Sequence, residues 1–188
     1  MMKKYRLHLL ALVVALQTAA LVGMVAVKHR TLITGTPILL KTEPVDPRSL
    51  FRGDYVVLNY AIGSLDYAAL DGDNAFERHD AVFVVLRQGE HYWEPVSVHH
   101  EMPAPEPESV VIRGEVQYSG VWIGGENRDG INVRYGIESY FVPEGEGREI
   151  ELPRNEGKVA ILVAVDGGAA AIKAVLIDGV VRYEEKLF

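Results

Sequence analysis

Histidine and acidic side chains gather between residues 79 and 101, and these are residue types that bind zinc. His91, His99 and the pair His100-Glu101 follow His79-Asp80. In a strand His91 and His99 share one face, whereas His100 points to the other. A zinc site needs three or four ligands that converge on the metal. We therefore interpret the cluster as surface histidines at a strand end and expect no metal site.

A second candidate for metal chemistry is the acidic run Asp71-Gly72-Asp73-Asn74. Calcium loops place their oxygen ligands at fixed spacings and usually close with a bidentate glutamate, and this run has neither feature. It is predicted to be a solvated turn. Other carboxylates are numerous, but an acid–base pair is meaningful only where two of them share a pocket, which the sequence does not show. We accordingly expect no catalytic residues and no cofactor.

The most specific pattern is Gly53-Asp54-Tyr55-Val56-Val57-Leu58-Asn59-Tyr60, which fits the signature GDYxxLxY at every fixed position. Gly53 permits a tight turn, and Asp54 can accept hydrogen bonds from backbone N–H groups in it. Strand alternation puts Leu58 and Tyr60 on the buried face and Tyr55 on the opposite one. The pattern therefore predicts an architectural role, with a ligand site as the alternative.

The signature is preceded by Asp46-Pro47-Arg48-Ser49-Leu50-Phe51-Arg52 and followed much later by a segment that runs from Tyr135 to Val142. With these flanks, nearly the whole chain resembles the bacterial membrane-anchored family named after the signature, the GDYXXLXY proteins. The resemblance implies an N-terminal anchor and, because members are often encoded beside multi-span membrane proteins, a partner of that class. It supplies no reaction. The candidate binding residues are Gly53, Asp54, Tyr55, Leu58, Tyr60, Tyr135, Gly136, Glu138 and Tyr140.

The same region also looks like part of a signal peptidase, in which a membrane helix is followed by a nucleophile segment, a Gly-Asp turn and a strand. In this chain the segment that corresponds to the nucleophile segment is Glu43-Pro44-Val45-Asp46-Pro47, which contains no serine. Ser49 comes only after the proline. No lysine occurs between Lys41 and Lys158. Because a serine peptidase needs a base within hydrogen-bond reach of its nucleophile, the likeness indicates a scaffold that lacks the Ser/Lys dyad.

The N-terminal residues predict a membrane anchor. Leu7 to Val27 carry no formal charge apart from His8, and 21 residues of helix span roughly 30 Å, the thickness of a hydrocarbon core. A cleaved signal peptide would have a shorter apolar run with a small-residue site at its end. Three positive residues precede the run and Lys28 and Arg30 follow it. This balance places the N-terminus in the cytoplasm and the remainder, residues 31–188, outside the bacterial inner membrane, in a periplasmic or extracellular position.

Charge separates the anchor from the rest of the chain. All 26 acidic residues lie after residue 30, whereas five of the 19 basic residues lie before residue 31, so the remainder carries 14 minus 26, or −12. That charge argues against nucleic acid as a partner and against a domain that lies flat on anionic lipid. Disulfides and thiolate chemistry are excluded because the chain has no cysteine.

Residues 31–188 read as one mainly β domain, a sandwich or barrel-like fold built from short strands and glycine turns. Three segments recur in the same order, which suggests two pseudo-symmetric halves with a groove between them; shared β-strand composition is the alternative explanation of the likeness. The proposed matches are Tyr60–Ser64 with Tyr135–Ser139, the hairpin at Gln88-Gly89 with that at Gly167-Gly168, and Val110–Tyr118 with Val175–Tyr183.

These features predict a non-catalytic accessory or interaction module, tethered to the lipid bilayer by one helix and partnered by a multi-span membrane protein. The alternatives are a small-ligand binding module that uses the groove between the halves, and an envelope hydrolase on the signal-peptidase-like scaffold.

Overall fold

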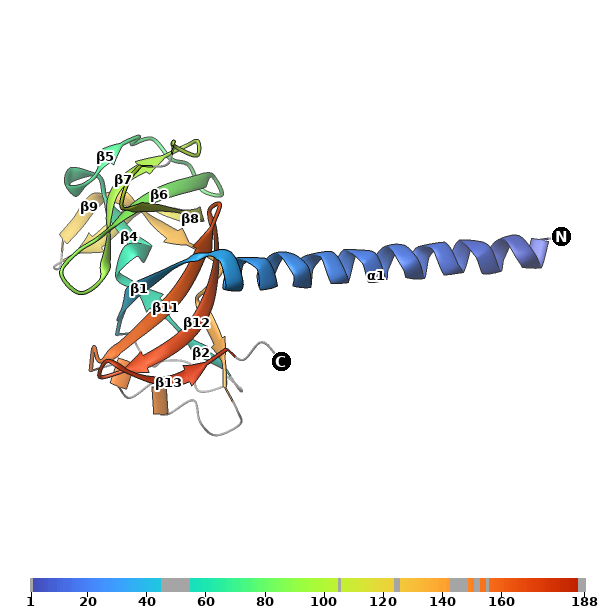
Figure 1. Ribbon diagram of the computed structural model, residues 1–188. Helices are drawn as coiled ribbons and strands as arrows, with labels where there is room; N and C mark the ends of the chain where they lie inside the picture. Colours follow the sequence, from blue (N-terminus) through green and yellow to red (C-terminus); the bar gives the residue numbers. More distant parts are fainter. Residues whose placement is uncertain are drawn as a thin grey trace.

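The computed structural model describes residues 2–44, 55–104, 106–123, 126–142, 149–150, 153–154 and 156–185. It consists of one long N-terminal helix that projects from a β-rich domain (Figure 1). The helix α1 (Met2–Thr34) contains the segment His8–Thr34, which is long and apolar enough to cross a membrane. An 18-residue stretch of this segment has a mean hydropathy of 2.4 and is not buried in the protein. The predicted order, an apolar helix followed by a mainly β domain, is confirmed.

The helix continues seven residues past its expected end at Val27, because its last turn packs on the domain. Thr31 and Leu32 are buried there. The carboxylate of Asp166 accepts a hydrogen bond from Thr34 Oγ1 at 3.1 Å and lies 3.5 Å from Arg30 Nε. The first strand therefore begins only at Thr36, after the helix has ended.

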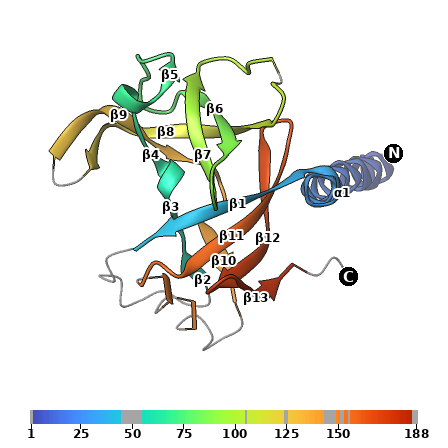
Figure 2. The ribbon, with the colours of Figure 1, turned by 60° about the vertical axis from the view of Figure 1, so that its left-hand side comes forward.

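A single residue, Gly35, separates α1 from the first strand. A Cβ at this position would lie 2.5 Å from the carbonyl oxygen of Thr31 and 2.9 Å from the amide nitrogen of Val165, so only glycine fits without displacing backbone. The helix is thus joined to the domain without a flexible linker, and Figure 2 shows β1 leaving the helix end and crossing the domain.

Within the described residues, the strands form two larger sheets and one short pair. The five-stranded sheet has the order β13-β12-β11-β1-β3, and the six-stranded sheet has the order β4-β9-β8-β6-β7-β5. β2 and β10 form the two-stranded pair. The strands are β1 (Thr36–Glu43), β2 (Tyr55–Val57), β3 (Asn59–Tyr60), β4 (Ser64–Asp66), β5 (Asp71–Gly72), β6 (Ala81–Gln88), β7 (Trp93–His99), β8 (Ser109–Ile123), β9 (Glu126–Arg134), β10 (Ser139–Phe141), β11 (Val159–Asp166), β12 (Ala169–Ile177) and β13 (Val180–Glu184), with 3-10 turns η1 (Ala61–Gly63) and η2 (Tyr67–Ala69).

The inner faces of both sheets bury their side chains in one hydrophobic core. Alternation along the strands selects these residues, because every second side chain points inward. Members that are essentially inaccessible to solvent include Ile38, Leu40, Val56, Leu58, Val82, Val84, Ile112, Ile131, Ile161 and Val163. The predicted inward face of the signature strand, Leu58 and Tyr60, is confirmed.

The strand registers confirm two pseudo-symmetric halves. β4 pairs Ser64 with Asn132, and β10 pairs Ser139 with Val57, so one shift of 75 residues converts the first pairing into the second. The hairpins β6–β7 and β11–β12 correspond as well: the register slips between Val85 and Leu86 in one and between Leu162 and Val163 in the other, a shift of 77 residues. Two predicted matches are therefore structural equivalences.

The third predicted match is wrong. Val110–Tyr118 lies within the continuous strand β8, whereas Val175–Tyr183 runs from β12 through the turn at Asp178-Gly179 into β13. Both turn residues have positive φ, 52° and 78°. The structural counterpart of β8 is β1, since Arg113 pairs with Phe83 as Lys41 pairs with Ala160.

The halves are interlocked rather than side by side. β1 and β3 come from the first half, and they share a sheet with β11 and β12 of the second. Conversely, β8 and β9 of the second half share a sheet with β6 and β7 of the first. Each sheet therefore requires both halves, and neither half has a sheet of its own.

One buried carboxylate gives the domain a predicted sensitivity to acid. Asp66 accepts a hydrogen bond from the amide of Ala68 and lies 3.0 Å from Arg128 Nη1, and these contacts lower its pKa. A lowered pKa in the folded state stabilises the fold above the unfolded pKa of about 3.9, and this stability is lost as the pH falls through the folded value. We expect Asp66→Asn to lower the melting temperature at pH 7 and to make the melting temperature fall less between pH 7 and pH 3 than it does in wild type.

Glu90→Gln, in an exposed turn, is the control and should change neither the melting temperature at pH 7 nor its fall toward pH 3. If the melting temperatures of Asp66→Asn and wild type fell equally between pH 7 and pH 3, this account would be contradicted.

Candidate functional site

The signature strand and its counterpart meet through two buried tyrosines. Tyr60 donates a hydrogen bond from its hydroxyl to the carbonyl oxygen of Ile137 at 2.6 Å. Tyr135 donates to the carbonyl oxygen of Ile62 at 2.7 Å. Each tyrosine therefore bonds the residue two positions after the other tyrosine, which is the reciprocal contact expected of a two-fold relation. The final tyrosine of the signature, Tyr60, therefore connects the two halves through a hydrogen bond.

These hydroxyl groups are held in the protonated form. Burial, and secondarily the nearby carboxylate of Glu138, raises the pKa of both Tyr60 and Tyr135 above the usual value. Both phenols consequently stay neutral and act as permanent hydrogen-bond donors.

The loop after Tyr135 is held by Glu138. Its side-chain oxygen accepts a hydrogen bond from the amide of Tyr135 at 2.5 Å, and its backbone carbonyl accepts from the amide of Leu58 at 2.8 Å. Gly136 has φ 80°, a conformation that glycine adopts without strain, and a Cβ there would meet nothing within 4 Å. The backbone of the loop is therefore exposed to solvent at Gly136, whereas the two hydrogen bonds of Glu138 hold the loop in place.

A cavity of about 520 Å³ opens between this loop and the outer face of the six-stranded sheet. β8 contributes Arg113 and Glu115, β9 contributes Arg134, and the loop before β6 contributes His79. The remaining lining residues are Ala81, Gly114, Tyr135, Gly136, Glu138 and Ser139.

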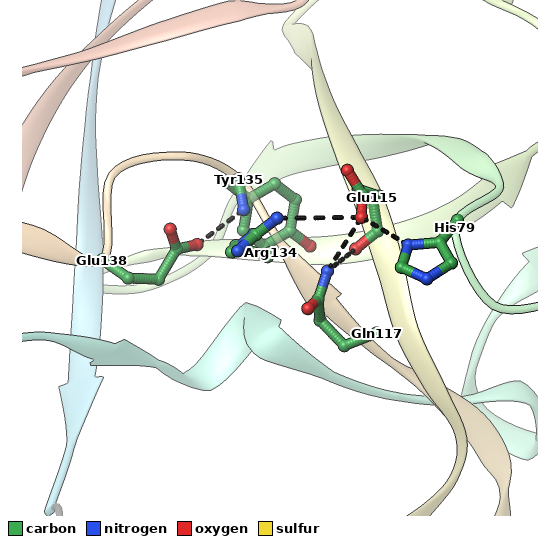
Figure 3. Close-up of polar contacts among 6 residues, drawn as sticks. All are labelled: His79, Glu115, Gln117, Arg134, Tyr135 and Glu138. Atoms are coloured by element: carbon green, nitrogen blue, oxygen red, sulfur yellow. Dashed lines mark hydrogen bonds and ion pairs between the residues drawn. The ribbon is translucent and has the colours of Figure 1, made fainter.

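Three of the polar groups in the cavity form an internally balanced network (Figure 3). Glu115 Oε1 lies 3.0 Å from His79 Nδ1 and 3.7 Å from Arg134 Nη2. The hydrogen bond from His79, followed by the charge of Arg134, lowers the pKa of Glu115. His79 reaches this position with φ 74°, a conformation uncommon for a residue with a side chain.

Two further charged groups in the cavity have no ion partner within the described part of the chain. The guanidinium of Arg113 lies over the ring of Phe83, 6.0 Å from its centroid. Glu138 has only the backbone contact described above. One unpaired positive group and one unpaired negative group thus face the same cavity.

The candidate binding residues fall into three groups. Gly53 and Asp54 lie outside the described residues, and Tyr55 forms strand β2 opposite Phe141. Leu58, Tyr60, Tyr135 and Tyr140 have buried side chains, so a partner would meet the backbone around them rather than the rings. Gly136 and Glu138 line the cavity and are accessible.

The histidine cluster does not converge. His99 Nε2 lies 2.9 Å from Ser97 Oγ, whereas the ring of His100 stacks on Phe76 with 4.0 Å between centroids. In the acidic turn, Asp73 accepts a hydrogen bond from the amide of His100 at 2.8 Å. No group of three or more His, Asp or Glu side chains that could hold a metal ion occurs among the residues the structure describes.

Arg113, Glu115 and Arg134 were not predicted as site residues, and His79 was considered only as a metal ligand. A usable signal was present, because Arg113 and Glu115 alternate on one predicted strand and must share a face. The pairing of β8 with β9, which adds Arg134 opposite Glu115, is a long-range contact that no local pattern reveals.

Family comparison agrees with the signature and with the architecture around it. The family model described as GDYXXLXY protein matches residues 17–175. The chain belongs to the GDYXXLXY family. This match to the GDYXXLXY model includes most of α1 and all strands from β1 to β11, so the helix and the interlocked halves lie within the matched region. No curated protein and no solved structure matches the chain.

Proposed function

We propose that this GDYXXLXY protein is a non-catalytic accessory module, anchored in the bacterial inner membrane with its β domain on the periplasmic side, and that it partners a multi-span membrane protein. The observation that carries the proposal is the joint between α1 and β1. A single glycine with no room for a side chain separates the membrane helix from the first core strand.

This joint fixes both the distance of the domain from the membrane surface and its orientation relative to that surface. From Arg30, the last charged residue of the helix, to Thr34 the chain rises only about 6 Å. The contacts of Arg30 and Thr34 with Asp166 then hold the helix end against the turn between β11 and β12. A domain held in this way presents one constant face to its neighbours in the bilayer, and confinement raises its effective concentration against them.

The periplasmic placement rests on charge. Three positive residues precede the apolar run and two follow it, which favours a cytoplasmic N-terminus. The net charge of −12 after residue 30 keeps the domain off anionic lipid, in agreement with a module held upright rather than one spread on the surface.

The test asks whether partner binding needs only the membrane anchor or also the fixed orientation of the domain relative to α1. A short Gly/Ser segment inserted between Thr34 and Gly35 preserves the anchor and the fold but releases the fixed orientation. The control carries the same segment in the β6–β7 turn at Gly89, away from the joint. Each full-length protein is expressed in its native membrane, crosslinked, purified and analysed by mass spectrometry.

We expect wild type and control to recover the same multi-span membrane protein and the joint variant to recover about tenfold less of it. Equal recovery by the joint variant would show that the rigid joint is not required. Absence of any multi-span protein from the wild-type sample would overturn the accessory role.

A further inference from the structure

We propose that the cavity between β8, β9 and the Tyr135–Ser139 loop binds a small zwitterion, a molecule with an oxyanion at one end and an ammonium group at the other. This binding site goes beyond the accessory role and does not depend on it.

The charges of the cavity specify both ends of such a ligand. Glu115 is the ion partner of both His79 and Arg134. Arg113 and Glu138 are the charged lining groups without an ion partner in the described chain, and they have opposite signs. Arg113 offers a planar fork that matches a carboxylate or phosphate, and Glu138 offers an acceptor to an ammonium group.

The shape of the cavity agrees with a small ligand. Its volume of about 520 Å³ falls in the range of small-molecule sites. Gly136 leaves open space above the loop backbone, so a ligand can approach closely there. The guanidinium of Arg113 lies over the ring of Phe83, and this contact restrains the side chain before a ligand arrives, which lowers the entropic cost of binding.

The opposite half provides a natural comparison. Arg113 corresponds to Lys41 on β1, and Glu115 corresponds to Glu43, since each pair holds the same register position. There Lys158 pairs directly with Glu156 at 2.7 Å. Lys41, Asn59 and Glu156 hold the positions that correspond to Arg113, Arg134 and His79, so the two positions differ in charge and the site departs from the pseudo-symmetry.

The location of the cavity favours a phospholipid headgroup as the source of the zwitterion. The amide of Arg113 donates to the carbonyl of Gly168 at 2.9 Å, and Asp166, in the same turn, contacts Thr34 and Arg30 at the end of α1. The backbone of Arg113 is therefore bonded to the same turn that contacts the end of α1 at the joint with β1. A domain of charge −12 repels anionic headgroups but not zwitterionic ones. A soluble amino acid carries the same two charges and is the other possible source.

Isothermal titration calorimetry on the full-length protein in detergent micelles tests the charge pairing. The probes are phosphoethanolamine, which carries both charges, inorganic phosphate and ethanolamine. We expect phosphoethanolamine to bind at least about tenfold more tightly than either of the others. Arg113→Gln should weaken phosphoethanolamine binding about tenfold, with Arg113→Lys intermediate.

Glu138→Gln supplies the distinguishing result. Its amide oxygen can still accept the hydrogen bond from Tyr135, so the loop is retained. We expect it to weaken phosphoethanolamine about tenfold and leave inorganic phosphate unchanged. Lys41→Gln, the counterpart position, should affect neither probe. Melting temperatures establish that each variant is folded.

Two further probes identify the source. Tighter binding of short-chain phosphatidylethanolamine than of glycine assigns the site to a lipid headgroup, and the reverse assigns it to an amino acid; both support zwitterion recognition. The proposal is overturned if no zwitterionic probe binds, if phosphate alone binds as tightly as phosphoethanolamine, or if Glu138→Gln has no effect.

Discussion

Replacing Leu58 with alanine is expected to lower the free energy of unfolding by about 2–5 kcal/mol. Leu58 is completely buried and belongs to the core formed by the inner faces of both sheets. Its truncation removes apolar contacts and leaves a cavity that a core shared by interlocked sheets can only partly close. Urea unfolding of the full-length protein in detergent micelles measures the change.

Val57 provides the matched control for Leu58. It is the preceding residue, occupies a variable position of the signature and is half-buried on the opposite face of the strand. We expect Val57→Ala to cost about 1 kcal/mol or less. A loss below about 1 kcal/mol for Leu58→Ala, or equal losses for the two variants, would contradict the assignment of the signature leucine to core packing.

Local sequence patterns correctly predicted those elements that do not depend on contacts between distant parts of the chain. The apolar run predicted α1, and strand alternation predicted which side of the signature enters the core. The helix extends beyond the apolar run because Thr31 and Leu32 are buried against the domain, so their helical conformation is decided by tertiary contact. The β12 strand, whose alanines favour helix on propensity, is extended because it pairs with β11 and β13.

The internal repeat shows where sequence comparison succeeds and where it fails. Tyr60–Ser64 and Tyr135–Ser139 were recognisable because their tyrosines make the same reciprocal contact, in which each hydroxyl donates to a backbone carbonyl of the other segment. β1 and β8 occupy the same place in their sheets but have diverged, so residue types did not reveal them. The apparent likeness of Val110–Tyr118 to Val175–Tyr183 arises from composition, since the second segment contains a turn in place of a continuous strand.

The cavity was missed for a related reason. His79, Arg113 and Arg134 come from three separate segments, and only the pairing of β6 and β9 with β8 brings them together. Glu138, in contrast, was selected from the signature's counterpart segment and does line the cavity. Tyr135 and Tyr140 were selected for the same reason, and both side chains are buried, although Tyr135 also lines the cavity.

The paired variants Tyr60→Phe and Tyr135→Phe test whether the interlocked halves act as one unit. Each substitution removes a donor from a buried carbonyl and should cost about 1–3 kcal/mol. Both bonds secure the same two loops, so loss of one lets the loops separate and weakens the other. We therefore expect the double variant to cost less than the sum of the single variants, by at least about 0.5 kcal/mol, in a double-mutant cycle measured by urea unfolding.

An exposed tyrosine separates this effect from the general consequence of losing a hydroxyl. Tyr118 on β8 is 55% exposed, and Tyr118→Phe should change stability by less than about 0.5 kcal/mol. Additive losses at Tyr60 and Tyr135 would mean that each bond stabilises its own loop independently, and that the halves are joined by the sheets alone. A measured coupling would instead explain why the signature ends in tyrosine: phenylalanine would fill the same space, but only the hydroxyl reaches the carbonyl of the opposite half.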